Sequence, residues 1–288
     1  MARRSFLATL SASVAAACSP LGTLNGLNNI APGDRGAARV AADVPFGDDP
    51  RQRLDIYAPA NVAAASNPVL VFFYGGSWAS GYRQGYAFAA KAFASRGYTV
   101  VVPDYRLVPD VHFPAFVEDG AAAVAWTLAN IGRHGGDPAR LAVMGHSAGA
   151  YIAMMLALDT QWLKAAGAAP SRIRAAVGLA GPYDFHPFVV DATRNAFGKA
   201  PDGRLTQPVA FARPDAPPTF LAYGEQDRLV LPKNSVALAE VLEKAGAPVT
   251  LKAYPDLGHV GIVTALSKPF RSRAPVLADT IEFLGRTV

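Results

Sequence analysis

The feature that most constrains the fold of this chain is the alternation of short apolar runs with longer helical stretches. The short runs are rich in β-branched residues and bounded by turn residues, which predicts buried strands. They lie at 53–57, 69–74, 98–102, 141–144, 175–180, 219–223 and 249–254. Helices are predicted between them, at 85–95, 117–131, 148–158, 233–245 and 274–284. We therefore expect an α/β fold with a mostly parallel sheet, helices on both faces, and chemistry at the carboxyl ends of the strands.

Length and composition are those of a folded globular protein. The chain has 288 residues, of which 51% are hydrophobic and 17% are charged, and these values argue against disorder. Its net charge of +5 comes from scattered basic residues, so nucleic-acid binding is not expected. One large domain is predicted over residues 40–288. Within it, residues 181–218 show no regular spacing of apolar residues, and we expect them to form a small lid over the strand ends.

The N-terminus has the layout of a secretory signal. Arg3 and Arg4 precede a short apolar stretch that ends in small residues, and the arginine pair resembles a twin-arginine export motif. Residues 1–17 are therefore interpreted as a signal peptide. Residues 18–39 are interpreted as a polar, Gly/Asn-rich linker of an exported protein.

Cys18 is the only cysteine, which excludes an intrachain disulfide and a cysteine-built metal site. The Ala-Ala-Ala-Cys sequence that ends at Cys18 resembles a bacterial lipobox, although leucine is usual at the position of Ala15. Two interpretations stay open. The protein is either periplasmic with an incidental cysteine, or a lipoprotein that lipidated Cys18 anchors to a membrane.

Gly145-His146-Ser147-Ala148-Gly149 is a G-x-S-x-G sequence between a predicted strand and a predicted helix. That context is typical of a nucleophile elbow, a strained turn that presents the serine hydroxyl above the sheet. The residues on either side must be small because larger side chains would collide with the strand and the helix. We therefore predict Ser147 as a nucleophile. The alternative is a close-packed strand–helix junction with an idle serine.

A serine nucleophile needs a base, and the base needs an orienting carboxylate. With an elbow of this kind, the acid and then the histidine follow the serine along the chain. Asp227 and His259 each follow a predicted strand, so both loops reach the sheet edge where Ser147 lies. We predict Asp227 as the acid and His259 as the base. Asp227 is preferred to Glu225 and Asp256 because it lies farther past the strand end.

Glycines follow the strand predicted at 69–74, and they let backbone N–H groups point at a substrate oxygen. We expect an oxyanion hole built from the amides of Gly76 and Ser77 together with that of Ala148, which directly follows the nucleophile. The alternative is a simple glycine turn with Trp78 packed below it.

Several motifs in this order resemble the α/β-hydrolase esterases, most closely the hormone-sensitive-lipase-related carboxylesterases and their feruloyl-esterase and arylformamidase relatives. The motifs are Tyr74-Gly75-Gly76-Ser77-Trp78, Asp104-Tyr105-Arg106-Leu107, Phe113-Pro114-Ala115, Asp119, Gly136-Asp137-Pro138, 145–149, 224–227 and Gly258-His259. The resemblance covers residues 40–288. It implies an eight-stranded sheet, a triad of Ser147, Asp227 and His259, and neither a metal nor an organic cofactor.

One residue departs from the pattern of these esterases. Tyr74 stands where they usually have a histidine that braces the oxyanion loop, and we expect altered loop support with retained catalysis. Asp104, Arg106 and Asp119 are predicted to form a buried polar network that holds this loop.

The substrate pocket is predicted to be apolar with aromatic walls. Its predicted residues are Trp78, His146, Tyr183, Asp184 and Phe185.

The sequence thus predicts a serine hydrolase that cleaves carboxylic esters of small to medium acyl or aryl groups through an acyl-enzyme intermediate. Its expected partner is a small-molecule ester. An amidase, an arylformamidase or a peptidase with the same triad is the nearest alternative, and no sequence feature separates it. A non-catalytic exported binding protein of the same fold is a third interpretation. The intact elbow and all three triad positions argue against it.

Overall fold

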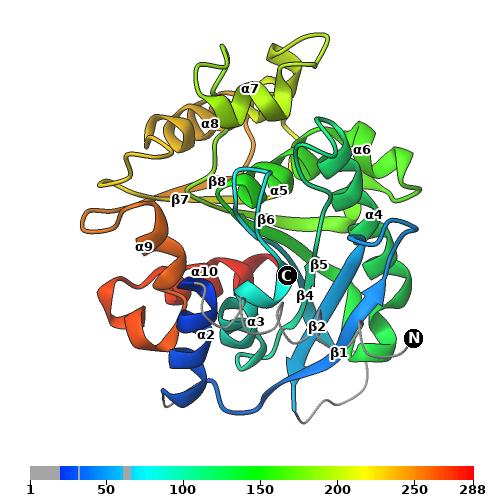
Figure 1. Cartoon of the computed structure of the whole chain (residues 1–288), viewed down its shortest axis with the longest axis vertical. Helices are drawn as coiled ribbons and strands as arrows, with labels where there is room; N and C mark the ends of the chain where they lie inside the picture. Colours follow the sequence, from blue (N-terminus) through cyan, green and yellow to red (C-terminus); the bar gives the residue numbers. More distant parts are fainter. Residues whose placement is uncertain (1–19, 32, 61–65) are drawn as a thin grey trace, which may run out of the picture.

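The computed structural model describes residues 20–31, 33–60 and 66–288, which build one eight-stranded sheet with helices on both faces (Figure 1). The strands are β1 (Ala37–Pro45), β2 (Arg53–Pro59), β3 (Asn67–Phe73), β4 (Thr99–Pro103), β5 (Gly136–His146), β6 (Ile173–Leu179), β7 (Thr219–Gly224) and β8 (Val249–Tyr254). Their order is β1-β2-β4-β3-β5-β6-β7-β8. β2 is antiparallel to both of its neighbours, and the other pairs are parallel. The predicted mostly parallel sheet is confirmed.

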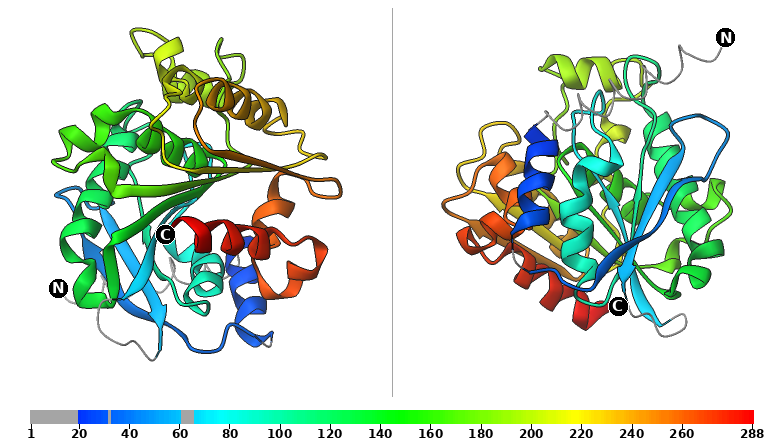
Figure 2. Two further views of the ribbon diagram at one scale, coloured as in Figure 1. Left: turned by 180° about the vertical axis from the view of Figure 1, so that it is seen from behind. Right: turned by 60° about the horizontal axis from the view of Figure 1, so that its bottom comes forward.

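Helices cover both faces of this sheet (Figure 2). The α-helices are α2 (Pro20–Ile30), α3 (Ala87–Ala94), α4 (Ala115–Asn130), α5 (Ala148–Leu158), α6 (Thr160–Ala165), α7 (Asp191–Phe197), α8 (Lys233–Lys244), α9 (His259–Thr264) and α10 (Val276–Thr287). α3 packs on β1, β2 and β4, and α10 packs on β6 and β7. On the opposite face, α4, α5 and α8 pack on strands from β3 to β8. The five predicted helices correspond to α3, α4, α5, α8 and α10.

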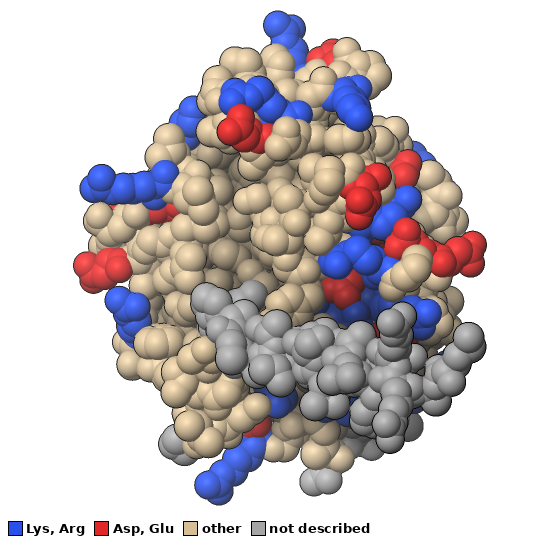
Figure 3. All heavy atoms as spheres, viewed as in Figure 1, with Lys and Arg blue, Asp and Glu red and all other residues tan. Residues whose placement is uncertain are grey.

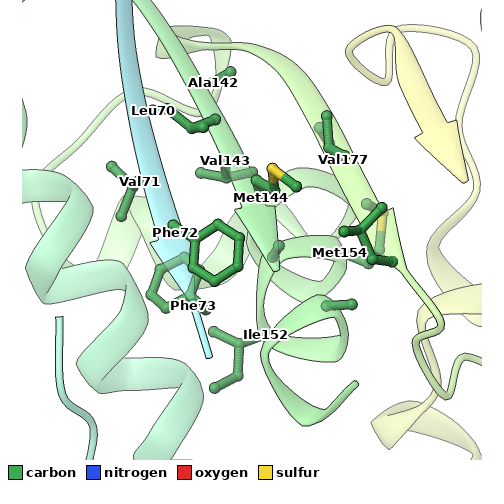
Figure 4. Packing of buried hydrophobic residues seen from close by; sticks show 14 of the residues in the cluster. Leu70, Val71, Phe72, Phe73, Ala142, Val143, Met144, Ile152, Met154 and Val177 are labelled. Carbon is green, nitrogen blue, oxygen red and sulfur yellow. The ribbon is translucent and has the colours of Figure 1, made fainter. Parts of the chain in front are cut away.

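The core is centred on β3, β5 and α5. Apolar side chains of these elements lie close together in Figure 4 and belong to one buried cluster. Every residue of α5 is buried, and β3 is buried from Val69 to Phe73. An element enclosed on all sides reads as a continuous apolar run, which is why the sequence indicated both clearly. The turn between β5 and α5 is therefore supported by elements that are buried on all sides.

The strand β1 was not predicted. None of its residues is buried, so the segment lacks the apolar run or the alternation that indicates a strand. Its antiparallel pairing with β2, from Ala37 opposite Pro59 to Pro45 opposite Arg53, forms it instead. Long-range backbone hydrogen bonding, which leaves little trace in local sequence, thus defines this edge of the sheet.

The expected linker at 18–39 is partly structured, which corrects that prediction. Residues Pro20–Ile30 form α2 beside α3, and Leu24 and Asn28 are buried. Asn25 donates to the carbonyl oxygens of Gln84 and Gly85 at 3.0 and 2.9 Å. The asparagines that suggested a loop act instead as hydrogen-bonding partners of other elements.

Residues 181–218, the predicted lid, cross the carboxyl ends of the strands near the top of Figure 1. They contain α7 and two single-turn 3₁₀ helices, η4 (Arg204–Thr206) and η5 (Pro208–Phe211), joined by irregular segments. The backbone N–H groups of Tyr183 and Asp184 both donate to the buried Asn234 Oδ1 at 3.0 Å. The segment is therefore fixed to the start of α8.

Residues 1–17 and Cys18, on which the signal-peptide and lipidation predictions rest, lie outside the described residues. Within the described part of the chain, no helix combines the length and apolarity needed to span a bilayer. On the face shown in Figure 3, acidic and basic side chains are interspersed around the periphery, with no extended region of one sign.

Candidate active site

Ser147 occupies a strained turn between β5 and α5. Its backbone has φ 55° and ψ −124°, a conformation that non-glycine residues rarely adopt and that concentrates at functional sites. A Cβ added to Gly145 would lie 2.2 Å from the carbonyl carbon of Gly149. One added to Gly149 would lie 2.1 Å from the carbonyl oxygen of Phe73. The prediction that only small residues fit around the serine is confirmed.

His259 lies beside Ser147 and connects it to Asp227. His259 Nδ1 is 2.8 Å from Asp227 Oδ2, and its Nε2 is 2.9 Å from Ser147 Oγ. A carboxylate oxygen can only accept, so Nδ1 carries the proton and Nε2 presents its lone pair to the hydroxyl. The structure thus brings together the three side chains predicted as a triad, from loops 80 and 32 positions apart in sequence.

Asp227 is buried, and both of its carboxylate oxygens accept hydrogen bonds. Its Oδ1 accepts from the backbone N–H groups of Leu229 and Val230, each at 2.9 Å. Burial opposes ionisation of this carboxyl, but the hydrogen bond and charge attraction of His259, with the two N–H groups, hold the pKa of Asp227 below its ordinary value. The competing acids, Glu225 and Asp256, are both exposed.

The predicted oxyanion residues divide into two groups. Ser77 and Ala148 line the same cavity as Ser147, and Ala148 begins α5, whose first N–H groups have no partner within the helix. Gly76 does not line this cavity. Its φ of 143° and the close approach of Ser80 require a glycine to form the turn, and its carbonyl accepts from Ser80 N at 3.0 Å. That Gly76 also supplies a donor stays a prediction.

The turn after β3 is strained beyond what the sequence suggested. Ser77 and Trp78 both have positive φ, 53° and 59°, although neither is a glycine. Consecutive strained residues persist only where the surroundings hold them in place. Here Trp78 is buried against aromatic rings, with Phe197 edge-on at 4.8 Å and Tyr151 edge-on at 5.5 Å between ring centroids.

Tyr74, the residue that departs from the resemblance, is buried and supports this turn from below. Its ring stacks on Tyr105 with centroids 4.7 Å apart, and the Tyr105 hydroxyl donates to the Tyr74 carbonyl at 2.9 Å. Arg51 Nη2 donates to the Tyr74 hydroxyl at 2.9 Å and to the Gly81 carbonyl at 3.2 Å. Arg51 Nε donates to the Tyr105 carbonyl at 2.9 Å. The sequence analysis missed Arg51, which precedes β2 and carries no local signal.

The predicted network of Asp104, Arg106 and Asp119 is two clusters, which corrects that prediction. Asp119 pairs with Arg106, whose backbone N–H donates to it at 2.7 Å. Asp104 instead pairs with Arg83, a buried guanidinium that also binds Asp55 at 2.9 Å. Sequence spacing could not reveal Arg83, because its partners come from distant elements.

His146 was predicted in the pocket wall, but it lies beneath the site. Its Nδ1 is 3.3 Å from the Tyr86 hydroxyl, and its Nε2 is 3.0 Å from the His259 carbonyl oxygen. Complete burial, reinforced by the nearby His259, lowers the pKa of His146 to about 3. This imidazole is therefore neutral at ordinary pH.

The cavity above Ser147 has a volume of about 370 Å³. Trp78, Asp184 and Phe185 line it, as predicted. Tyr183 does not, because its side chain turns inward and fills the space above Gly178 on β6. Within residues 20–31, 33–60 and 66–288, no cluster of three potential metal ligands occurs.

The sheet order, the serine turn and the two loops that reach it define a protein of the α/β-hydrolase fold. The chain belongs to the BD-FAE family, whose model matches residues 54–242, more than half of its length. The predicted resemblance to α/β-hydrolase esterases is thereby confirmed.

Curated relatives carry esterase names. The chain is 31% identical over 264 residues to the isoprenylcysteine alpha-carbonyl methylesterase ICME of Arabidopsis thaliana, covering 84% of this chain and 61% of that protein. It is 29% identical over 234 residues to Esterase LipC of Mycobacterium tuberculosis, covering 74% and 58%. The chain thus spans about three-fifths of the length of these relatives.

Solved structures share the fold. An inhibited Esterase B from Lactobacillus rhamnosis superposes with a TM-score of 0.77 at 21% identity, covering 98% of this chain and 96% of that one. The butyrate-bound Est2 from Thermogutta terrifontis superposes with a TM-score of 0.71 at 22% identity, covering 88% and 95%.

Proposed function

We propose that this protein is a serine hydrolase that cleaves carboxylic esters of small to medium acyl or aryl groups. The observation that carries the proposal is the continuous hydrogen-bonded line from Asp227 through His259 to Ser147, with contacts of 2.8 and 2.9 Å. An idle serine at a close-packed junction would not require a buried carboxylate and an oriented imidazole beside it. Esterase names among the relatives support the same reaction class.

The reaction proceeds in two acyl transfers. His259 Nε2 removes the proton of Ser147 Oγ as this oxygen attacks the ester carbonyl, and Asp227 stabilises the imidazolium that forms. The tetrahedral intermediate collapses when His259 protonates the leaving alcohol, which leaves an acyl group on Ser147. A water molecule, activated by the same imidazole, then releases the acid and restores the serine.

The negative charge of the tetrahedral intermediate needs donors already in place. The N–H groups of Ser77 and Ala148 are the candidates that line the cavity, with Gly76 as a third predicted donor. Removing one such donor typically costs on the order of 100- to 1000-fold in rate. The strained backbone of Ser77 supports this role, because it fixes the direction of an amide that would otherwise relax.

Ser147→Ala is the decisive test. We expect hydrolysis of p-nitrophenyl butyrate to fall by several orders of magnitude, and labelling by a fluorophosphonate probe to disappear. Ser171→Ala is the matched control, since Ser171 is exposed and lies outside this cavity, so its variant should retain both activities. Hydrolysis by Ser147→Ala at a rate close to that of the wild type would refute the proposal. Failure of the wild-type protein to react with the probe would favour the binding-protein interpretation.

An amidase remains the second candidate, because the same triad can expel an amine. Matched pairs of aryl esters and aryl amides with one acyl group decide between them. We expect kcat/KM to be higher for the ester in each pair.

We further propose that the protein is exported, with Cys18 either lipidated or incidental. Mass spectrometry of the mature N-terminus tests both parts. A mature chain that begins at a diacylated Cys18 would identify a lipoprotein, whereas a chain that retains residues 1–17 would refute export.

A further inference from the structure

Four large apolar side chains surround the mouth of the cavity that contains Ser147. Val189 and Val190, just before α7, are 71% and 54% exposed, and Leu229 and Leu231, between β7 and α8, are 72% and 48% exposed. We call these four residues the apolar collar. Single exposed apolar residues are ordinary, but a group of them around one cavity marks a binding surface.

Both sides of the apolar collar are held by hydrogen bonds. On one side, Asp227 Oδ1 accepts from the N–H groups of Leu229 and Val230 at 2.9 Å. On the other, the Thr193 hydroxyl donates to the Val190 carbonyl at 2.9 Å, which ties Val190 to the first turn of α7. A surface already fixed in its binding shape loses little conformational entropy when a ligand arrives.

The cavity and the apolar collar form one continuous surface. Ser77, Ser147 and Ala148 line one part of it, and the collar lines another. Val189 and Leu229 line the same cavity as Ser147, so an ester attacked by Ser147 Oγ can extend a long substituent over either side chain. Polar and charged side chains, among them Asp184, also line this cavity, so it suits a molecule with both polar and apolar parts.

We propose that the apolar collar is a substrate subsite that binds an aliphatic chain, so that the preferred substrates are amphiphilic esters with a chain longer than butyryl. This inference rests on the proposed ester hydrolysis at Ser147. Each methylene that leaves water contributes about 0.8 kcal/mol, or roughly fourfold in affinity, when fully buried. The specificity constant should therefore rise as the chain lengthens from the cavity onto the collar.

The experiment compares chain-length profiles of the wild type and of Val189→Ser/Val190→Ser, which leaves the loop that binds Asp227 unchanged. Both positions are largely exposed, so the variant should fold with an unchanged melting temperature. Leu205→Ser is the matched control, because Leu205 is 57% exposed in the same lid segment but does not line the cavity. One substrate series varies the acyl chain from acetyl to decanoyl. A second varies the alcohol of butyrate esters, and so identifies which half of the ester meets the collar.

For the wild type we expect kcat/KM to rise from butyryl to octanoyl esters in one of the two series. In the double variant, kcat/KM for the octanoyl or octyl ester should fall about 5- to 20-fold through KM, with less than about twofold change for the acetyl ester. Leu205→Ser should keep the wild-type profile.

Equal losses at every chain length, or a wild-type profile that falls beyond butyryl, would overturn the subsite. The subsite is also overturned if the variant changes only vesicle binding or oligomeric state, since the collar would then meet a membrane or a second copy. These results leave the proposed hydrolysis intact as long as Ser147→Ala is inactive.

Discussion

His146 Nε2 lies 3.0 Å from the carbonyl oxygen of His259. That carbonyl can only accept, so Nε2 of His146 carries the proton and Nδ1 accepts from the Tyr86 hydroxyl. The same hydroxyl accepts from the Gly75 N–H at 3.3 Å. A chain of hydrogen bonds thus joins the strand end that precedes the oxyanion turn to the backbone of the proposed base.

Tyr86→Phe should lower kcat about 3- to 10-fold with little change in KM, because it removes the central hydroxyl of this chain and retains the ring. Burial raises the pKa of Tyr86 to about 12, so the hydroxyl remains protonated at every working pH. Steady-state kinetics with p-nitrophenyl butyrate measure the effect. Tyr98→Phe is the control, since Tyr98 is buried against Phe93 and does not line the cavity. Equal kcat values for Tyr86→Phe and wild type would show that these hydrogen bonds do not help to position His259.

Asp227→Asn should lower kcat by roughly four orders of magnitude, because an amide can hold His259 in the wrong tautomer and cannot stabilise its charged form. Asn still offers an oxygen to the N–H groups of Leu229 and Val230, so the fold should survive. Circular dichroism checks folding, and ester kinetics check rate. Glu225→Gln and Asp256→Asn should each change kcat less than about twofold. A large loss in either variant, with Asp227→Asn active, would assign the acid elsewhere.

Folding stability should decrease as the pH falls from about 6.5 towards 3, because His146 is buried neutral. Its folded pKa of about 3 lies below the unfolded value of about 6.5, so the unfolded state binds the extra proton across this window. The pKa of Asp227 is also lowered in the folded state, and its protonation decreases the folding stability further only below about pH 4. His146→Gln keeps a donor and an acceptor without a titrating ring, and should give a shallower dependence between pH 6.5 and 4. Melting temperatures of the wild type and of His146→Gln, measured across this pH range, test the prediction. The same pH dependence of the melting temperature in both proteins would be inconsistent with a neutral buried His146.

Gly149→Ala and Gly285→Ala should act in opposite directions. The new methyl at Gly149 would meet the Phe73 carbonyl at 2.1 Å, and we expect a loss of about 3 kcal/mol or more, or failure to fold. Gly285 lies in α10 with open space at its Cβ position, so alanine there should stabilise by about 0.5–1 kcal/mol. Urea unfolding measures both. A tolerated alanine at Gly149 would mean that the turn is less tightly packed than described.

Tyr74→Phe should lower kcat about 3- to 10-fold, because Arg51 loses the hydroxyl that it binds beneath the oxyanion turn. Arg51→Lys should show a similar loss, since one ammonium cannot reach the Tyr74 hydroxyl and the carbonyls of Tyr105 and Gly81 together. Ester kinetics of the two single variants and the double variant test the pair. Losses that simply multiply in the double variant would show that the two residues act independently.

Much of the fold was predictable because its central elements are enclosed. The runs at β3, β5 and α5 carry continuous apolar sequence. The chain order of Ser147, Asp227 and His259, each after a predicted strand, was enough to place three loops at one edge of the sheet. The local pattern of apolar residues was sufficient to predict these elements, because an element that is buried on all sides must carry apolar side chains.

Elements defined by distant partners were not predictable in the same way. β1 has no buried residue and exists through pairing with β2. Arg83 and Arg51 act through carboxylates, hydroxyls and carbonyls far away in sequence. His146 and Tyr183 were expected in the pocket because they neighbour pocket residues, but each side chain turns toward the interior. Adjacency in sequence does not determine which way a side chain points.

The two oxygens of Asp227 serve different neighbours, one the imidazole and the other the loop that carries Leu229. Redesign of that loop for new substrates will therefore disturb the acid and reduce turnover along with selectivity. Val189, on the opposite side of the mouth, has no such attachment to the triad among the described contacts. Substitutions at Val189 and Val190 should therefore broaden the range of accepted esters with the smallest decrease in kcat.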